Sequence, residues 1–163
     1  MEIINNPSTG NHLPILMKIV GITDGPILEL GMGMFSTPFL HWACFMERKL
    51  VSYDNNPQFL DYFKRYPCNF HEIKLAADWD KIDISGHWSV ALVDHNPKWR
   101  RKEEIKRLAN STDYIIAHDS QGLRDRDYGY TQIYPLFKYR LDFTKTRPFT
   151  TVLSNFKDLS NLL

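Results

Sequence analysis

Residues 26–37 read Pro-Ile-Leu-Glu-Leu-Gly-Met-Gly-Met-Phe-Ser-Thr. The apolar residues at 27–30 predict a buried strand, the two glycines predict a turn, and Ser36 or Thr37 is a typical cap for a helix that begins there. A second apolar run, residues 51–53, ends in Asp54, about 20 residues beyond the glycines. In doubly wound folds, such a turn brings backbone close to a nucleoside, and such an acid accepts hydrogen bonds from ribose. The alternative is that the glycines serve only the turn.

The motif departs from other nucleotide-binding patterns. Ser36 stands where the dinucleotide pattern has its third glycine, and the chain has no G-K-[ST] for a P-loop. The short E-L-G-x-G form, with Glu29 before Gly31 and Gly33, resembles motif I of the class I S-adenosylmethionine-dependent methyltransferases. Asp54 resembles their acidic motif II. The resemblance implies S-adenosylmethionine as cofactor, and the missing third glycine disfavours a nicotinamide enzyme.

The bulk composition narrows the class of protein. The chain has 163 residues, 43% of them hydrophobic and 24% charged, with a formal net charge of +1. These values predict one globular domain over residues 1–163, with a loose arm at 1–10, and they give no electrostatic footprint for nucleic acid. No secretory signal or membrane-spanning apolar run is evident, and Cys44 and Cys68 are expected to be ordinary thiols. A cytoplasmic protein is therefore expected.

Strand and helix patterns alternate along the chain. Apolar runs predict strands at 27–30, 49–53, 70–75, 88–93 and 113–117, and amphipathic patterns predict helices at 12–20, 36–47, 56–66 and 98–109. Residues 137–143 and 149–154 predict a final antiparallel pair. The family that motif I resembles has this α/β architecture, a Rossmann-like, mostly parallel seven-strand sheet with a C-terminal antiparallel pair. Residues 120–134 are expected to form a long loop, which is often functional.

Polar residues follow the predicted strands, and ligands bind at this edge of open α/β sheets. The resemblance implies that Ala77, Asp78 and Trp79 frame the adenine, although Asp78 could instead cap a helix while Trp79 packs on the sheet. We expect the cofactor to contact Glu29, Gly31, Gly33, Ser36, Asp54, Asn55, Ala77, Asp78, Trp79 and Asp94.

The segments LVDH at 92–95 and AHD at 117–119 are similar to the catechol-type O-methyltransferases. That resemblance implies that Asp94 and Asp119 hold a divalent cation such as Mg²⁺ and that Lys98 acts as base. Ser120 replaces that family's asparagine ligand, and Lys98 lies one residue further from Asp94 than the family's lysine. Without a metal, His95 or His118 could be the general base, or both could be structural.

Two further features border this region. Residues 96–99 (NPKW) depart from the N-P-P-aromatic motif of amino-group methyltransferases, which counts against methylation of nucleic acid. Arg100 and Arg101 open a charged helix that is expected to be solvated, unless one arginine turns toward the cleft to bind an anion.

The combined prediction is a methyltransferase that acts on an oxygen or nitrogen of a small-molecule acceptor. The candidate catalytic residues are Asp94, His95, Lys98 and Asp119. Two alternatives stay open, namely an accessory protein that binds S-adenosylmethionine without transfer, and an enzyme that cleaves it. The final strand pair also offers an edge for a homodimer, and the oligomeric state is left open.

Overall fold

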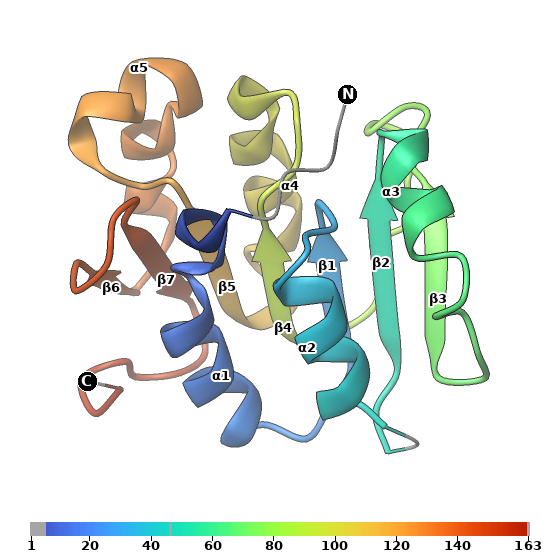
Figure 1. Cartoon of the computed structure of the whole chain (residues 1–163). Coiled ribbons are helices and arrows are strands. Elements are labelled where there is room, and N and C mark those ends of the chain that lie inside the picture. Colours follow the sequence, from blue (N-terminus) through green and yellow to red (C-terminus); the bar gives the residue numbers. More distant parts are fainter. Residues whose placement is uncertain (1–5, 46, 163) are drawn as a thin grey trace.

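The computed structural model describes residues 6–45 and 47–162. Its centre is a seven-stranded sheet in the order β3-β2-β1-β4-β5-β7-β6 (Figure 1). The first five strands are parallel, and β7 runs antiparallel between β5 and β6. The strands are β1 Ile27–Leu30, β2 Leu50–Asp54, β3 His71–Leu75, β4 Trp88–Val93, β5 Thr112–His118, β6 Tyr139–Phe143 and β7 Thr150–Ser154. The predicted fold class is confirmed.

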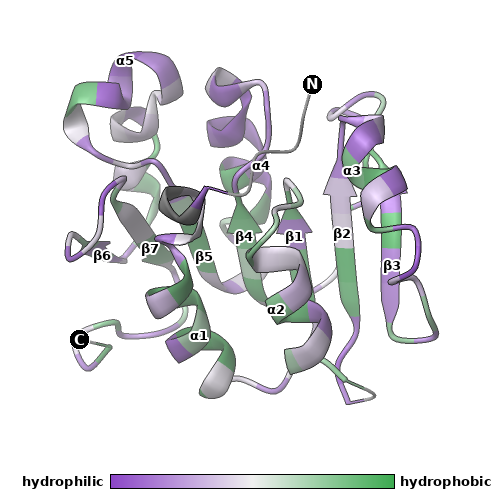
Figure 2. Ribbon diagram, in the orientation of Figure 1, coloured by the Kyte–Doolittle hydropathy of each residue, from purple (hydrophilic) through white to green (hydrophobic). Residues whose placement is uncertain are grey.

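Helices cover both faces of this sheet (Figure 1). The α-helices are α1 Leu13–Gly21, α2 Ser36–Ala43, α3 Pro57–Tyr62, α4 Arg101–Leu108 and α5 Asp125–Tyr128. Short 3₁₀ helices are η1 Pro7–Gly10, η2 Lys98–Arg100, η3 Gly122–Arg124, η4 Tyr130–Gln132 and η5 Tyr134–Leu136. Figure 2 shows apolar residues concentrated in the central strands and many polar residues in α4 and α5.

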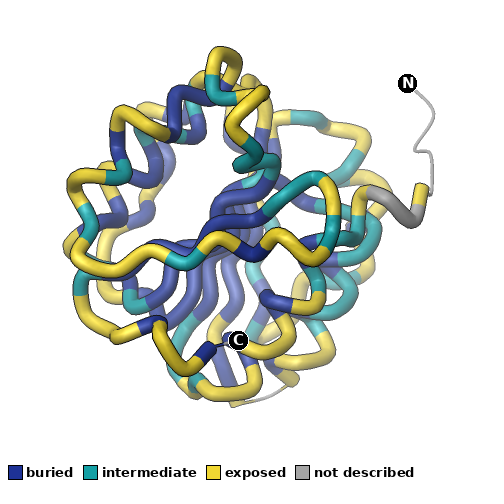
Figure 3. The backbone as a smooth tube through the Cα atoms, turned by 90° about the vertical axis from the view of Figure 1, so that its left-hand side faces the viewer, coloured by how far each residue is buried: buried dark blue, intermediate teal, exposed yellow. Residues whose placement is uncertain are grey.

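The alternation of side chains along each strand builds two cores. On one face, Ile27 and Leu92 belong to the same apolar cluster as Ile15 and Ile19 of α1. On the other face, Leu28 belongs to the same cluster as buried residues of α4. All six residues of β4 are buried, as a strand at the centre of a sheet covered on both faces requires (Figure 3).

Several predicted boundaries differ from the structure. The helix predicted at 36–47 ends at Ala43, the one predicted at 56–66 ends at Tyr62, and the one predicted at 98–109 begins as a 3₁₀ turn before α4. The predicted cap at Ser36 or Thr37 is wrong, because the structure places Phe35 at the N-cap position and Thr37 bonds to Glu29. Asn56 caps α3, because its side chain accepts a hydrogen bond from the backbone N–H of Gln58.

The expected loop at 120–134 is folded rather than irregular. It contains η3, α5 and η4 and reaches the start of η5. Tyr128, Tyr130 and Ile133 are fully buried in the core on the α4 face of the sheet. This burial anchors the segment, since each aromatic side chain removes a large apolar area from water. Of the predicted loose arm, residues 7–10 form η1, and residues 1–5 lie outside the described part.

Candidate functional site

A cavity of about 410 Å³ lies at the carboxyl ends of β1, β2 and β4. Its volume falls within the range of about 300–1,000 Å³ that is typical of small-molecule sites. Among its lining residues are these candidates from the sequence: Gly33, Ser36, Asp54, Asn55, Asp94 and His95. The wall is completed by residues that were not among the predicted site residues: Thr9, His12, Met32, Met34, Phe35, Asn56, Phe59 and Asn96.

The two glycines of the turn have different roles. Gly31 has a φ of +99°, and a Cβ there would lie 2.5 Å from the backbone nitrogen of His95. A side chain is therefore excluded because the end of β1 packs directly on the chain that leaves β4. Gly33 lines the cavity, and its backbone N–H donates to the hydroxyl of Thr37 at 3.0 Å.

Asp54 ties the end of β2 to the glycine turn. Its Oδ2 accepts from the backbone N–H of Met32 at 2.8 Å, and its Oδ1 accepts from that of Asn56 at 2.7 Å. Burial raises the pKa of this carboxyl, and the backbone hydrogen bonds oppose that rise. Each carboxylate oxygen has a further lone pair, so Asp54 can still accept hydrogen bonds from a ligand in the cavity that it lines.

Glu29 lies beneath the turn and is fully buried. Its carboxylate accepts from the hydroxyls of Thr37, at 3.0 Å, and Ser52, at 2.6 Å. Burial raises its pKa to about 7, although these hydroxyl donors act in the opposite direction. The network continues from Ser52 to His71 and from His71 to His41, each step spanning 3.0 Å. Glu29 therefore supports the turn from below through Thr37.

The residues expected at the adenine lie beside the cavity. Within the described chain, none of Ala77, Asp78 and Trp79 belongs to its wall. Asp78 is exposed and accepts from the backbone N–H of Asp80 in a turn, and the helix that it was alternatively expected to cap is absent between β3 and β4, all of whose residues are described. Trp79 is buried, stacks on the ring of His95 at 3.9 Å between centroids, and donates to the backbone oxygen of Asn96.

Asp94, one of the candidate catalytic residues, lines the cavity, and its carboxylate is paired with Arg101 and His118. Its Oδ1 lies 2.9 Å from the Arg101 guanidinium and 3.1 Å from Nδ1 of His118. Burial alone would raise the pKa of Asp94, but the charges of His118 and Arg101 hold it well below its usual range. Burial likewise opposes ionisation of His118, but the Asp94 carboxylate raises the pKa of this imidazole overall.

Asp119 is bound by cationic and hydroxyl groups of the chain itself. Its Oδ1 lies 2.8 Å from Arg124, and its Oδ2 accepts from the Tyr128 hydroxyl at 2.7 Å and lies 3.3 Å from Arg101. Arg101 thus stands between Asp94 and Asp119, the two residues expected to share a cation. The sequence analysis allowed that Arg100 or Arg101 turns toward the cleft to bind an anion. Arg101 does so, and its anionic partners are these two carboxylates of the chain itself.

His95 and Lys98 are engaged elsewhere. The His95 side chain is fully buried, with Nε2 3.1 Å from a carboxylate oxygen of Glu104. The Nζ of Lys98 lies 5.8 Å from the centre of the Tyr128 ring, in cation–π contact. His95 lines the cavity with its imidazole held against Glu104, and Lys98 does not belong to the described cavity wall.

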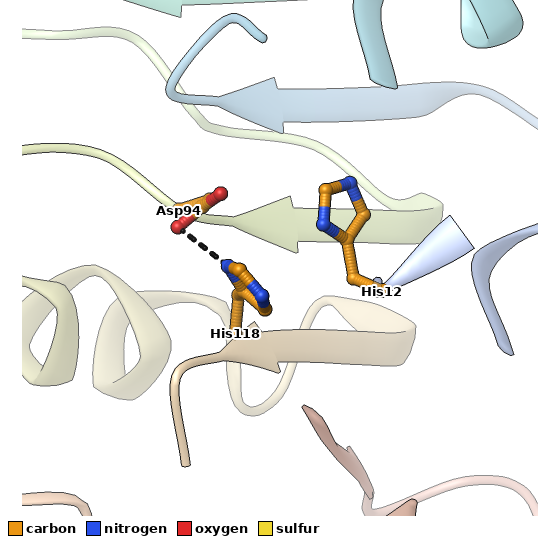
Figure 4. Close-up of side chains that lie close together, drawn as sticks. All are labelled: His12, Asp94 and His118. Atoms are coloured by element: carbon orange, nitrogen blue, oxygen red, sulfur yellow. Dashed lines mark ion pairs between the residues drawn. The ribbon is translucent and has the colours of Figure 1, made fainter. Parts of the chain in front are cut away.

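His12 is a residue of the site that the sequence analysis missed. It precedes α1, is only 2% exposed, and lines the cavity. Figure 4 shows it beside Asp94 and His118. Burial lowers the pKa of His12 to about 4. Its sequence position, at the edge of an amphipathic helix, is equally typical of a residue that merely covers the sheet.

A scan against models of known protein families finds no match, and a search of curated protein sequences finds none. Within the described residues, no helix is both long and apolar enough to cross a bilayer.

Solved structures do resemble the chain. They include the N-methyltransferase NodS from Bradyrhizobium japonicum WM9 (TM-score 0.64, 11% identity, 94% of this chain and 99% of that one). Another is the O-methyltransferase TomG from Streptomyces achromogenes in complex with SAM (TM-score 0.65, 15% identity, 93% and 82%). A third is an O-methyltransferase from Bacillus cereus in complex with SAH (TM-score 0.63, 16% identity, 94% and 84%). The sheet order, the glycine turn and these likenesses together show that the chain has the fold of the class I S-adenosylmethionine-dependent methyltransferases.

Proposed function

We propose that the cavity binds S-adenosylmethionine and that the protein transfers its methyl group to an oxygen or nitrogen of a small-molecule acceptor. The observation that carries this proposal is the position of Asp54. This carboxylate fixes the backbone of the glycine turn and lines the cavity at the same time. A ribose that lies across the turn would meet both the acid and the turn's backbone, which is how this fold binds nucleosides.

Proposed roles follow from position in the cavity. Gly33 and Ser36 contact the cofactor directly, while Gly31 and Glu29 shape the turn that holds it. Asp54 and Asn55 bind the ribose hydroxyls, and the partly buried ring of Phe59 offers an apolar surface to the adenine. Ala77, Asp78 and Trp79 act from behind this wall, Trp79 through its stacking on His95.

Methyl transfer would be an in-line displacement, in which the acceptor atom bonds to the methyl carbon while the carbon–sulfur bond breaks. Such a reaction depends mainly on positioning, and it needs an acceptor that has lost or can lose a proton. Of the four candidate catalytic residues, Asp94 is the one we place beside the acceptor. Asp119 would position Arg101, which pairs with Asp94. His95 and Lys98 would have structural roles, through their contacts with Glu104 and Tyr128.

Calorimetric titration with S-adenosylmethionine and with its demethylated product tests cofactor binding. We expect micromolar affinity for the full chain and a loss of at least tenfold for Asp54→Asn, which keeps the shape but removes the charge. The matched control is Asp61→Asn, since Asp61 is exposed on α3 and pairs only with Lys64 among the described residues. Equal affinity in wild type and Asp54→Asn would contradict the proposal.

The fate of the cofactor separates methyl transfer from the two alternative functions. Demethylated product that forms only in the presence of an added hydroxyl or amine acceptor supports transfer. Binding without product from any acceptor pool would favour an accessory protein. Cofactor loss without an acceptor would favour cleavage.

A further inference from the structure

One wall of the cavity carries a cluster that methyl transfer does not by itself require. His12 precedes α1, Asp94 follows β4, and His118 ends β5, so three separate segments contribute (Figure 4). Each side chain offers one ligand atom, and these atoms lie within 4.8 Å of one another. We propose that this cluster binds one first-row transition metal ion, such as Zn²⁺, Fe²⁺ or Co²⁺.

His12 gives the first argument. Its side chain is 2% exposed, and neither ring nitrogen has a hydrogen-bond partner in the part of the chain that the structure describes. Burying an imidazole without partners costs free energy, and buried polar atoms are rarely left in that state. A metal ion that accepts the lone pair of one ring nitrogen would compensate for this cost. The His12 and His118 rings are close enough for one ion to bind both, with 4.8 Å between their centroids.

His118 gives the second argument. Its Nε2 lies 2.7 Å from the side-chain oxygen of Asn11, and its Nδ1 lies 3.1 Å from Asp94. A histidine that binds a metal through one nitrogen commonly donates its other N–H to an oxygen, which fixes the ring orientation. Asn11 supplies that outer contact here, and it leaves Nδ1 directed toward the other two ligands.

The ligand set indicates the class of metal. Two imidazoles and one carboxylate suit Zn²⁺, Fe²⁺ and related ions, whereas Mg²⁺ and Ca²⁺ prefer oxygen ligands. One carboxylate oxygen of Asp94 completes the ligand set, and His118 Nδ1 already lies 3.1 Å from Oδ1 of this carboxylate. This site differs from the Asp94–Asp119 pair expected for Mg²⁺, because Asp119 is bound to Arg101, Arg124 and Tyr128.

Three protein ligands leave coordination positions free, and His12 and Asp94 both line the cavity. An ion held there could take an oxygen or nitrogen of the methyl acceptor as a further ligand and lower its pKa. This role of the ion in activating the acceptor rests on the proposed function. Metal binding itself does not rest on it, because all three ligands belong to this chain and are in place without cofactor.

The test is a titration of the chelator-treated full chain with Zn²⁺ by calorimetry and with Co²⁺ by visible absorption, in the absence of S-adenosylmethionine. We expect one ion per chain, with imidazole-type ligand-field bands for Co²⁺, and much weaker binding of Mg²⁺. His12→Ala should weaken Zn²⁺ binding by more than the about 10–100-fold that is typical of changes in the outer shell of a metal site. His87→Ala, which changes a half-exposed histidine paired with Asp113, should leave affinity unchanged.

Two further measurements keep the test decisive. Asp119→Asn should retain Zn²⁺ binding, and loss of binding there but not in His12→Ala would overturn the proposal in favour of the Asp94–Asp119 pair. If His12→Ala does not fold, nitrogen NMR of the wild-type imidazoles decides, since Zn²⁺ should shift the ring nitrogens of two of the six histidines. Absence of stoichiometric binding, or shifts confined to other histidines, would overturn the proposal. Because metal binding is measured without S-adenosylmethionine and cofactor affinity in a separate titration, a failure of one proposal is distinguishable from a failure of the other.

Discussion

At the scale of single residues, the site depends on positions where the surroundings limit which side chain fits and which contacts it can make. Gly31 has no room for a side chain, Glu29 has no access to water, and Asp54 has both oxygens fixed by backbone donors. All three were chosen from the sequence as direct cofactor contacts. The structure gives Gly31 and Glu29 a supporting position and gives Asp54 a place in the cavity wall.

Gly31→Ala is expected to destabilise the protein. A positive φ costs a residue with a Cβ about 1–3 kcal/mol, and overlap with the backbone of His95 would add to that cost. The measurement is the free energy of unfolding in urea. Gly122→Ala is the control, since nothing described lies within 4 Å of the added Cβ there, and we expect a change within about 0.5 kcal/mol. Equal stabilities for the two variants would contradict this interpretation of the turn.

Glu29 should make stability depend on pH. Its pKa is about 7 in the folded protein against 4.5 as the reference, so the folded state binds the proton more tightly. The free energy of unfolding should therefore fall as the pH rises from 4.5 through 7, by about 3 kcal/mol at about 1.36 kcal/mol per pKa unit.

Glu29→Gln removes this titration, and the difference between the wild-type and variant stability curves isolates it. We expect that difference to change over this pH interval, whatever constant offset the amide introduces. Glu103→Gln is the control, because the Glu103 side chain on α4 is partly exposed and pairs with Lys106 at the surface. A difference curve for Glu29→Gln that is flat between these pH values would show that the carboxyl is not protonated more readily in the folded state.

At the scale of elements, the carboxyl ends of the strands are organised by caps and turns. Asn56 caps α3 and also donates its backbone N–H to Asp54, so the start of this helix and the acid of the site are linked. The hydroxyl of Thr37, by contrast, was expected to cap α2 and instead joins Gly33 to Glu29. Capping residues are recognisable in sequence, but which partner a hydroxyl takes depends on what lies beneath it.

Asn56→Ala should lower the free energy of unfolding by about 1 kcal/mol, the usual cost of losing an N-cap side chain. Asn56→Asp keeps an oxygen in the same position and should restore most of that loss. Thermal unfolding of the three proteins at neutral pH makes the comparison. If the alanine and aspartate variants were equally unstable, the cap would not be the source of the effect.

At the scale of the whole molecule, Arg101 connects the ends of neighbouring strands. It reaches from α4 to donate to the backbone oxygens of His95 and Asp94, and it lies beside Asp119 after β5. The guanidinium is almost fully buried. Because one buried cation faces two carboxylates, its removal would leave both without their shared partner.

Arg101→Met should therefore cost about 3–5 kcal/mol of stability, the range observed when one partner of a buried ion pair is removed. The control is Arg126→Met, because the Arg126 side chain is 90% exposed on α5. Chemical unfolding monitored by circular dichroism provides the measurement. A cost below about 1 kcal/mol would mean that water or another cation replaces the guanidinium.

The sequence by itself determined the class of sheet, its final antiparallel pair and the position of the glycine turn and its acid. These features follow from the spacing of apolar residues, with a period of two in strands and 3.6 in helices, and from glycine where the backbone needs a positive φ. Both signals lie within short stretches of the sequence. Only the tertiary structure decided what meets at the strand ends. His118 is joined to Asn11 across 107 residues of sequence, and Arg101 occupies the space between Asp94 and Asp119. No local pattern encodes such contacts, because they exist only once the strands are ordered and the first helix closes over them.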